Sequence, residues 1–574
     1  MKNRIYYFLV AIIVLTLYSC SDILNPETVT TLTEKSVITN YSNTQATVNA
    51  LYTYLPDGLS YIDGAMLASA SDEAEFTSET NSIQKFNTGV WSALDNPDGA
   101  WSTNFKGIYA ANQVLLNCDS VKMDYLKYDT TASGQQQYKT KLSNIHRWKY
   151  EARFMRAFFY FELVKRYGGV PILTHSLTLK DNYTDIPRDS LNTCIRFIVN
   201  ECDSAASVLP DNYADDDLGR ATKAAALALK SRVLLYAASD LFNDPSWASY
   251  SHPELISLVD SKSRQARWQD AANAAAEAIT SLTGAGYAID ASYTNVFRSY
   301  TSKEIILAKR YGSSNSFETT NYPIGYYLGN SGNTPTQNLV DDYEMKTTGK
   351  PFSWDNSVEA ANPYSNRDSR LGYTILTNNV QFKGRAVEAY TGGADGKGVS
   401  KATKTGYYIY KYIDPDLDLL QGYTSVHTWV IFRLAEMYLN YAEAVNEVSG
   451  PDSKAGAVSL TARQAISNTI RKRVGLRLIA PITKDSFRTI VRHERRIELA
   501  FEDHRLWDVR RWMIAKETLG VPARGVEITK SDTTFTYKRI NVEDRLFDTT
   551  KMYFYPIPQK ELQIEKGWVQ NPGW

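Results

Sequence analysis

Two carboxylates near the C-terminus have the residue type and spacing for acid–base chemistry. Glu498 and Glu502 are four residues apart in RHERRIELAFEDHRLWDVRRW (492–512), a spacing that puts two side chains on one face of a helix. Glycoside hydrolases use two carboxyl groups about 5–9.5 Å apart, so the spacing permits hydrolysis. The general acid of such a pair, however, needs a raised pKa.

Arginines crowd the same segment and change this interpretation. Nearby cations lower the pKa of a carboxyl group, which is the wrong direction for a general acid. We therefore interpret the two glutamates as part of a structural ion-pair network that docks the helix on its neighbours, and we predict no catalytic residues. The arginines concerned are Arg495, Arg496, Arg505, Arg510 and Arg511.

Metal-binding patterns are incomplete. His493-Glu494 begins like a zinc-protease helix, but Ile497 stands where the second histidine is required. His493 and His504 are eleven residues apart, about three helical turns, which is too far to share a metal by themselves. These histidines therefore predict no metal site, and the sequence predicts no cofactor.

An acidic loop, DNYADDDLGRAT (211–222), is the remaining metal candidate. Its carboxylates are Asp211, Asp215, Asp216 and Asp217. Such a cluster can hold Ca²⁺, but the EF-hand spacing and its terminal glutamate are missing. We interpret Asp217 or a neighbour as the cap of the following helix, and the sequence leaves open whether a structural calcium is bound.

Helices with apolar or small buried faces must position these residues. Residues 431–447 show the i, i+3, i+4, i+7 apolar spacing of an amphipathic helix. Residues 219–240 are rich in alanine, which favours helix and permits close helix neighbours. These patterns suggest stacked helical hairpins of the tetratricopeptide (TPR) type, without a clean repeat period. Further helices are predicted over 145–169, 268–280, 460–475 and 486–512.

Residues 284–430 interrupt the helical pattern. They are rich in Gly, Pro, Asn, Ser and Thr, and they hold short runs such as EIILAKRY (304–311) and GYYIYKYI (406–413). Such runs predict short strands between loops. Because binding residues concentrate on loops held by a rigid scaffold, this region is a candidate for ligand contact.

The N-terminus predicts export and lipid attachment. Lys2 and Arg4 precede the apolar run IYYFLVAIIVLTLY (5–18), which is too short to span a bilayer. Leu17-Tyr18-Ser19-Cys20 is similar to a lipobox, whose cysteine becomes the acylated first residue of the mature chain; Tyr18 stands where a smaller residue is commoner. We expect residues 1–20 to be a lipoprotein signal and acylated Cys20 to anchor the protein, since multiple acyl chains hold a protein on a membrane.

The net charge argues against one class of partner, and the cysteine positions limit the disulfides that can form. The 63 basic and 63 acidic residues cancel, which argues against nucleic acid, because that partner needs a basic face. Besides Cys20 the chain has Cys118, Cys194 and Cys202. Cys194 and Cys202 are about 12 Å apart along a predicted helix, beyond the reach of a disulfide. We expect buried thiols, while a pairing of Cys118 with either remains open.

Several segments, in order along the chain, resemble the SusD/RagB family of lipoproteins. GRATKAAALALKSRVLLYAASD (219–240) is similar to an early helix motif of that family, and PTQNLVDDYEM (335–345) to its middle motif. The end of the chain resembles the family's closing helices and terminal segment. The segments concerned are FRLAEMYLNYAEAVNE, RKRVGL, RHERRIELAFEDHRLWDVRRW and YPIPQKELQIEKGWVQNPGW (555–574).

The resemblance implies a mainly α fold with TPR-like helical hairpins packed against a loop-rich region with short strands. It divides the chain into residues 1–20, 21–240 and 241–574, with the loop-rich segment 284–430 inside the last part. It also implies a glycan-binding lipoprotein on the outer-membrane surface. Such a protein captures oligosaccharide or polysaccharide and delivers it to a SusC-like, TonB-dependent transporter.

Aromatic side chains in loops are the candidate sugar contacts, because flat rings stack on the C–H faces of sugars. The resemblance implies a platform drawn from an early loop and the loop-rich middle, which matches their positions. Trp101, in contrast, opens a predicted helix and is expected in the core. The predicted ligand-binding residues are Trp91, Tyr311, Tyr322, Tyr326, Tyr327 and Trp354.

Three alternatives remain at this stage. The protein could capture a non-glycan nutrient such as peptides, hydrolyse glycans on a helical fold, or serve only as a protein-interaction scaffold. Purified protein that released reducing ends from a polysaccharide would favour hydrolysis. Transporter binding without any saccharide affinity would favour the scaffold. The identity of the sugar depends on ring spacing and loop shape, which the sequence does not give.

Overall fold

The computed structural model describes residues 39–175, 177, 186–213 and 217–574. Cys20 of the lipobox, and Asp215 and Asp216 of the acidic loop, lie outside these residues. Among the described residues, no helix combines the length and apolarity needed to cross a bilayer.

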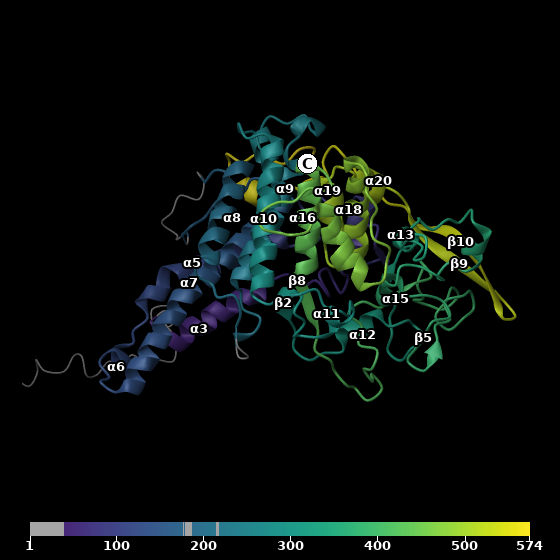
Figure 1. Ribbon diagram of the computed structural model, residues 1–574, viewed down its shortest axis with the longest axis horizontal. Helices are drawn as coiled ribbons and strands as arrows, with labels where there is room; N and C mark the ends of the chain where they lie inside the picture. The colour runs from purple at the N-terminus through teal and green to yellow at the C-terminus, as the bar shows by residue number, and fades with distance from the viewer. Residues whose placement is uncertain (1–38, 176, 178–185, 214–216) are drawn as a thin grey trace, which may run out of the picture.

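An array of long helices forms the scaffold, and each packs on the next in chain order (Figure 1). Serine or threonine caps most of them: the side chains of Thr131, Ser190, Thr222 and Ser263 accept a hydrogen bond from a first-turn backbone N–H. The array confirms the predicted mainly α fold. Its helices are α5 (Ala100–Asn117), α7 (Ala132–Tyr167), α8 (Leu191–Ala206), α9 (Lys223–Ala238), α10 (Arg264–Gly284), α16 (Leu434–Ser449) and α18 (Lys484–Glu498).

Shorter helices connect and flank this array. Residues Ile466–Arg471 continue α17 as a π-helical turn. The short helices are α3 (Tyr41–Ala50), α4 (Gln84–Thr88), α6 (Asp124–Lys127), α11 (Asn295–Arg298), α12 (Ser316–Asn321), α13 (Gln337–Asp342), α14 (Ser357–Ala361), α15 (Arg370–Thr374), α17 (Ala462–Ala465), α19 (Arg505–Arg511), α20 (Ala515–Leu519) and α21 (Gln559–Ile564).

The strands of the described chain form small antiparallel pairs, and several join distant segments. Pairing of β1 with β3 brings an early loop beside the loop-rich middle. The β9–β10 hairpin projects at the right edge of Figure 1. The pairs are β1 (Ala74–Phe76) with β3 (Asn333–Pro335), β2 (Ile305–Arg310) with β8 (Thr428–Arg433), β4 (Ile375–Leu376) with β7 (Tyr408–Ile409), β5 (Gln381–Phe382) with β6 (Arg385–Ala386), and β9 (Ala523–Ser531) with β10 (Thr534–Glu543).

Two predicted helix boundaries were wrong. The helix predicted over 431–447 begins only at Leu434, because the preceding residues belong to β8. The helix predicted over 486–512 is broken into α18 and α19, since Phe501 and Asp503 between them adopt positive φ angles of 61° and 59°. Glu498 is therefore the last residue of α18, and Glu502 lies in the following turn.

A single cluster of buried apolar residues extends from Val48 to Ile557. Helices on both sides of residue 240 share it, because α9 packs against both α10 and α16. The division at residue 240 therefore remains a sequence-based prediction. Cys118, Cys194 and Cys202 are free, buried thiols, so the disulfide that the sequence left open does not form.

Candidate functional site

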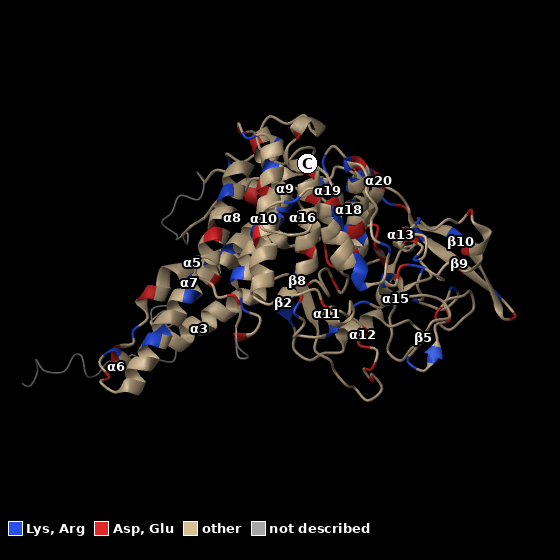
Figure 2. Ribbon diagram, viewed as in Figure 1, with Lys and Arg blue, Asp and Glu red and all other residues tan. Residues whose placement is uncertain are grey.

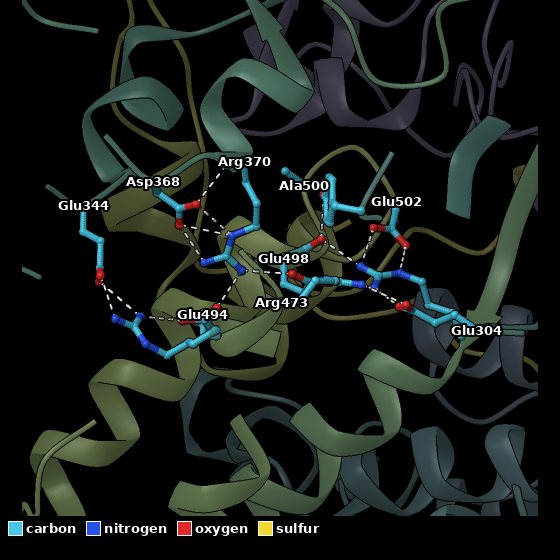
Figure 3. Close-up of polar contacts among 12 residues, drawn as sticks. Glu304, Glu344, Asp368, Arg370, Arg473, Glu494, Glu498, Ala500 and Glu502 are labelled. Atoms are coloured by element: carbon cyan, nitrogen blue, oxygen red, sulfur yellow. Dashed lines mark hydrogen bonds and ion pairs between the residues drawn. The ribbon is translucent and has the colours of Figure 1, made fainter. Parts of the chain in front are cut away.

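The glutamates with catalytic spacing lie in a buried ion-pair network (Figure 3). Glu498 accepts hydrogen bonds from Arg433 at 2.7 Å and Arg370 at 2.9 Å, and it also pairs with Arg473. Glu502 bonds the Nε of Arg433 at 2.7 Å and Lys411 at 2.7 Å. The predicted network is thus present, and it joins α18 to the end of β8.

The electrostatics of this network oppose general-acid chemistry. Burial alone would raise the pKa of Glu498, but Arg473, Arg433 and Arg370 together outweigh burial and hold that pKa well below its usual range. A glycosidase acid needs the opposite shift. Glu498 is 0% exposed, so a polysaccharide has no access to it.

Two of the candidate metal residues, His493 and Asp217, have protein partners. In the described part of the chain, no group of three His, Cys, Asp or Glu side chains is arranged to hold a metal ion. The Nε2 of His493 lies 2.6 Å from the carbonyl oxygen of Asp342. Asp217 pairs with Arg220 and Arg147, and the cap of α9 is Thr222 rather than Asp217.

Trp91 is not a surface ring. It is 2% exposed, and its ring centroid lies 4.5 Å from that of Trp574 and 4.9 Å from that of Tyr555. Turn residues around Trp91 predicted a loop correctly, but the C-terminal segment covers the ring. The predicted role of Trp91 as a stacking plane is therefore wrong.

Tyr322 and Tyr326 are likewise internal. Their exposures are 1% and 9%, and both rings meet Phe382 edge-on at centroid distances of 5.4 and 5.1 Å. The hydroxyl of Tyr322 donates to the carbonyl of Asp414 at 2.8 Å, and that of Tyr326 donates to the carbonyl of Phe382 at 3.1 Å. These rings hold the loop-rich region together, so their predicted place on an exposed platform is wrong.

Tyr311 and Trp354 are half-buried and lie in different parts of the molecule. The Tyr311 hydroxyl donates to Asp57 at 2.7 Å, in the segment that follows the first helix. The indole N–H of Trp354 donates to Asp341 at 2.9 Å, and the guanidinium of Arg539 from β10 lies 5.5 Å from its ring centroid. The rings of Tyr311 and Trp354 therefore do not form one binding surface.

Tyr327 is the one predicted ring that is largely exposed, at 56% of its surface. It belongs to the turn that leads into β3, where Thr77 from the early loop donates its backbone N–H to Gly332 at 3.0 Å. The ring of Tyr327 is thus exposed, as its predicted role requires, and the β1–β3 pair places an early loop beside Gly332 of the same segment.

Charged and amide side chains lie on the segments that adjoin this turn. Lys404 pairs with the exposed Glu79 at 2.9 Å, and the Nζ of Lys401 lies 3.4 Å from the amide oxygen of Asn330. We call the group the Tyr327 surface; it consists of Tyr327, Leu328, Asn330, Glu79, Lys401 and Lys404. One exposed aromatic plane with polar groups of both kinds can bind a ligand with apolar faces and hydroxyl edges.

Sequence reasoning missed the polar members of this surface. Glu79 follows β1, whereas Lys401 and Lys404 precede β7, so the Lys404–Glu79 ion pair joins segments that are far apart in sequence and that no local pattern brings together. Elsewhere, Figure 2 shows acidic and basic positions interspersed along the helical array, in keeping with a zero net charge.

Comparison with known proteins decides the family. The sequence profile of the SusD family matches residues 303–574. A second profile, described as "Starch-binding associating with outer membrane", matches residues 22–235. This chain belongs to the SusD/RagB family.

Related SusD-like proteins share the whole fold. A SusD-like protein from Bacteroides fragilis superposes with a TM-score of 0.77 at 28% identity, covering 95% of this chain and 99% of its own. A SusD-like carbohydrate binding protein from the same organism gives a TM-score of 0.72 at 25% identity, with coverages of 92% and 99%. SusD-like protein P2 of Formosa agariphila is 23% identical over 98% of each chain.

Proposed function

We propose that this SusD/RagB protein is a non-catalytic glycan receptor of the outer-membrane surface. It captures oligosaccharide or polysaccharide and delivers it to a SusC-like, TonB-dependent transporter. The observation that carries the proposal is the similarity, over 92% of this chain, to a protein described as a SusD-like carbohydrate binding protein. The profile named for starch binding at the outer membrane supports the same ligand class and location.

The Tyr327 surface is the proposed glycan contact. The ring of Tyr327 would stack on a sugar face, a kind of contact worth about 1–3 kcal/mol for flat ligands. Glu79, Asn330, Lys401 and Lys404 supply acceptors and donors for hydroxyl groups. Tyr311 and Trp354 stay predicted contacts through their exposed edges, at separate places from Tyr327.

Membrane attachment is part of the proposal. Acylated Cys20 would hold the protein on the outer membrane without a spanning helix, because more than one acyl chain gives stable anchoring. Labelling of growing cells with a radioactive fatty acid tests this step. The expected result is incorporation into the wild-type protein and none into Cys20→Ser; equal labelling of both would contradict it.

Replacing Tyr327 with alanine tests the glycan site. In affinity gels containing polysaccharide, the protein without residues 1–20 should lose most of its retardation when Tyr327 is changed, because the exposed stacking plane is removed. The melting temperature should not change, since 56% of the ring faces solvent. Tyr128→Ala is the matched control, because Tyr128 is 72% exposed at the end of α6, away from this surface.

Two outcomes would count against the proposal. Unchanged retardation of Tyr327→Ala on every polysaccharide that retards the wild type would remove Tyr327 from the site. No retardation of the wild type on any polysaccharide, together with capture of the transporter in detergent extracts, would favour a scaffold or a receptor for another nutrient.

A further inference from the structure

A cavity of about 640 Å³ lies between the start of α5 and the C-terminal segment. This volume falls within the usual range of about 300–1,000 Å³ for small-ligand sites. Aromatic side chains form much of its wall. The rings are Tyr54, Trp101, Phe105, Tyr109 and Trp568.

Helix periodicity aligns three of these rings. Trp101, Phe105 and Tyr109 are spaced by four residues on α5, so they form one stripe along the helix. The first two ring centroids are 4.8 Å apart. Burial decreases along the stripe, because Trp101 is 5% exposed and Tyr109 is 52% exposed. The stripe therefore runs from the floor of the cavity to its mouth.

Trp568 from the C-terminal segment forms another wall of the cavity. Trp568 meets Trp101 edge-on at a centroid distance of 5.9 Å. Its indole N–H donates to the carbonyl of Ile186 at 2.6 Å, which fixes the orientation of the ring. A cavity with rings held on two sides is preorganised for a flat ligand.

Polar side chains line the same cavity. Lys106, Lys560 and Glu561 are among them, together with the hydroxyl of Ser102. Lys560 and Glu561 pair with each other at 3.6 Å, so the lining carries both signs of charge. Aliphatic residues complete the lining: Pro171, Leu173, Leu177, Ile186 and Ile564. A ligand with apolar faces and hydroxyl edges could contact both the apolar walls and the polar side chains.

We propose that this cavity is a second carbohydrate site, which takes a short neutral oligosaccharide. The choice of carbohydrate over another amphipathic ligand rests on the proposed function. The cavity is separate from the Tyr327 surface, because α5 lies in the helical array and α12, the helix before Tyr327, lies in the loop-rich region on the other side of β2 and β8 (Figure 1). One protein molecule would then hold a polysaccharide at two places.

The test uses Tyr109→Ala and Phe105→Ala in the protein without residues 1–20. The probes are neutral oligosaccharides derived from starch, laminarin, xylan, mannan and galactan, titrated by calorimetry and by the total tryptophan fluorescence, to which Trp101 and Trp568 contribute. With at least one probe, both variants should bind about tenfold more weakly or worse at one of two sites. Tyr128→Ala should bind like the wild type, and Tyr327→Ala should keep the binding site that Tyr109→Ala weakens.

Each contrary outcome has one meaning. If a probe binds the wild type at a single site that Tyr327→Ala abolishes, while Tyr109→Ala and Phe105→Ala bind normally, the second site does not exist although the proposed function stands. If the wild type binds no probe and no polysaccharide, both proposals fail. Because Tyr109 is largely exposed, its replacement separates loss of binding from loss of folding.

Discussion

At the scale of single residues, Glu73 is a buried acid that the fold keeps protonated. It is 1% exposed, and its Oε1 has no hydrogen-bond partner among the described residues. The nearby arginines, Arg496 and Arg505, form their ion pairs with the neighbouring carboxylate of Asp72. At Glu73, desolvation by burial therefore outweighs the attraction of these arginines and raises the pKa of the carboxyl to about 8.

Glu73→Gln should change how stability depends on pH. A carboxyl whose pKa is higher in the folded than in the unfolded chain loses stability as pH rises between the two values, here from about 4.5 to about 8. The loss is at most about 1.4 kcal/mol per pH unit. The variant, which cannot ionise, should match the wild type near pH 4.5 and exceed it increasingly up to pH 8. Urea unfolding at several pH values measures this, and parallel curves would contradict it.

Single residues also show where sequence reasoning reached its limit. Glycine, proline and asparagine around Trp91 and Tyr322 predicted loops, but loop position does not tell what covers a ring. Trp574 covers Trp91 from the far end of the chain. Trp101 was expected in the core and is buried, yet its spacing to Phe105 and Tyr109 was a readable signal for an aromatic stripe.

At the scale of elements, Arg433 joins strand and helices through charge. It is the last residue of β8 and the residue before α16, and it is 1% exposed. Its guanidinium bonds Glu304, Glu498 and Glu502, each at 2.7 Å. Three segments that are distant in sequence thereby meet at one side chain. At Glu498, this cation and its neighbours Arg473 and Arg370 outweigh burial and keep the carboxylate ionised.

Replacing Arg433 with methionine should destabilise the protein strongly. Removal of one partner from a buried pair leaves uncompensated charge and costs about 3–5 kcal/mol. Lys85→Met is the control, because Lys85 and Asp95 form an exposed pair that contributes about 1 kcal/mol or less. Denaturant unfolding compares the two. Equal small losses would show that the network near Glu498 does not hold β8 and α18 together.

Elements differed in how far the sequence predicted them. Long helices with regular apolar spacing were predicted because their periodicity is local. The break between α18 and α19 was missed, since the Arg-rich segment reads as continuous helix and only tertiary contacts hold Phe501 and Asp503 at positive φ. The sequence predicted where short strands of the middle region lie, but it did not predict which strands pair. The partners can be far apart in sequence: β1 and β3, for example, are separated by more than 250 residues.

At the scale of the whole molecule, the early part of the described chain contacts both the middle region and the C-terminal segment. The early loop pairs with the middle region through β1 and β3, and the C-terminal segment covers Trp91. Arg188 donates to the carbonyl of Val569 at 2.8 Å and to Asn571 at 2.9 Å. One apolar cluster runs through all of these parts. We therefore infer that the division predicted at residue 240 does not separate two independently stable units.

This arrangement predicts one cooperative unfolding transition for the protein without residues 1–20. Circular dichroism and tryptophan fluorescence should give coincident urea curves, because the rings of Trp91 and Trp574 and the helical array share one core. Residues 21–240 and 241–574, produced separately, should each unfold without a sharp transition, since each would expose the face of α9 or of α10 and α16 that it normally buries. A sharp transition in either fragment would establish a separate domain and would move the glycan sites onto parts that fold alone.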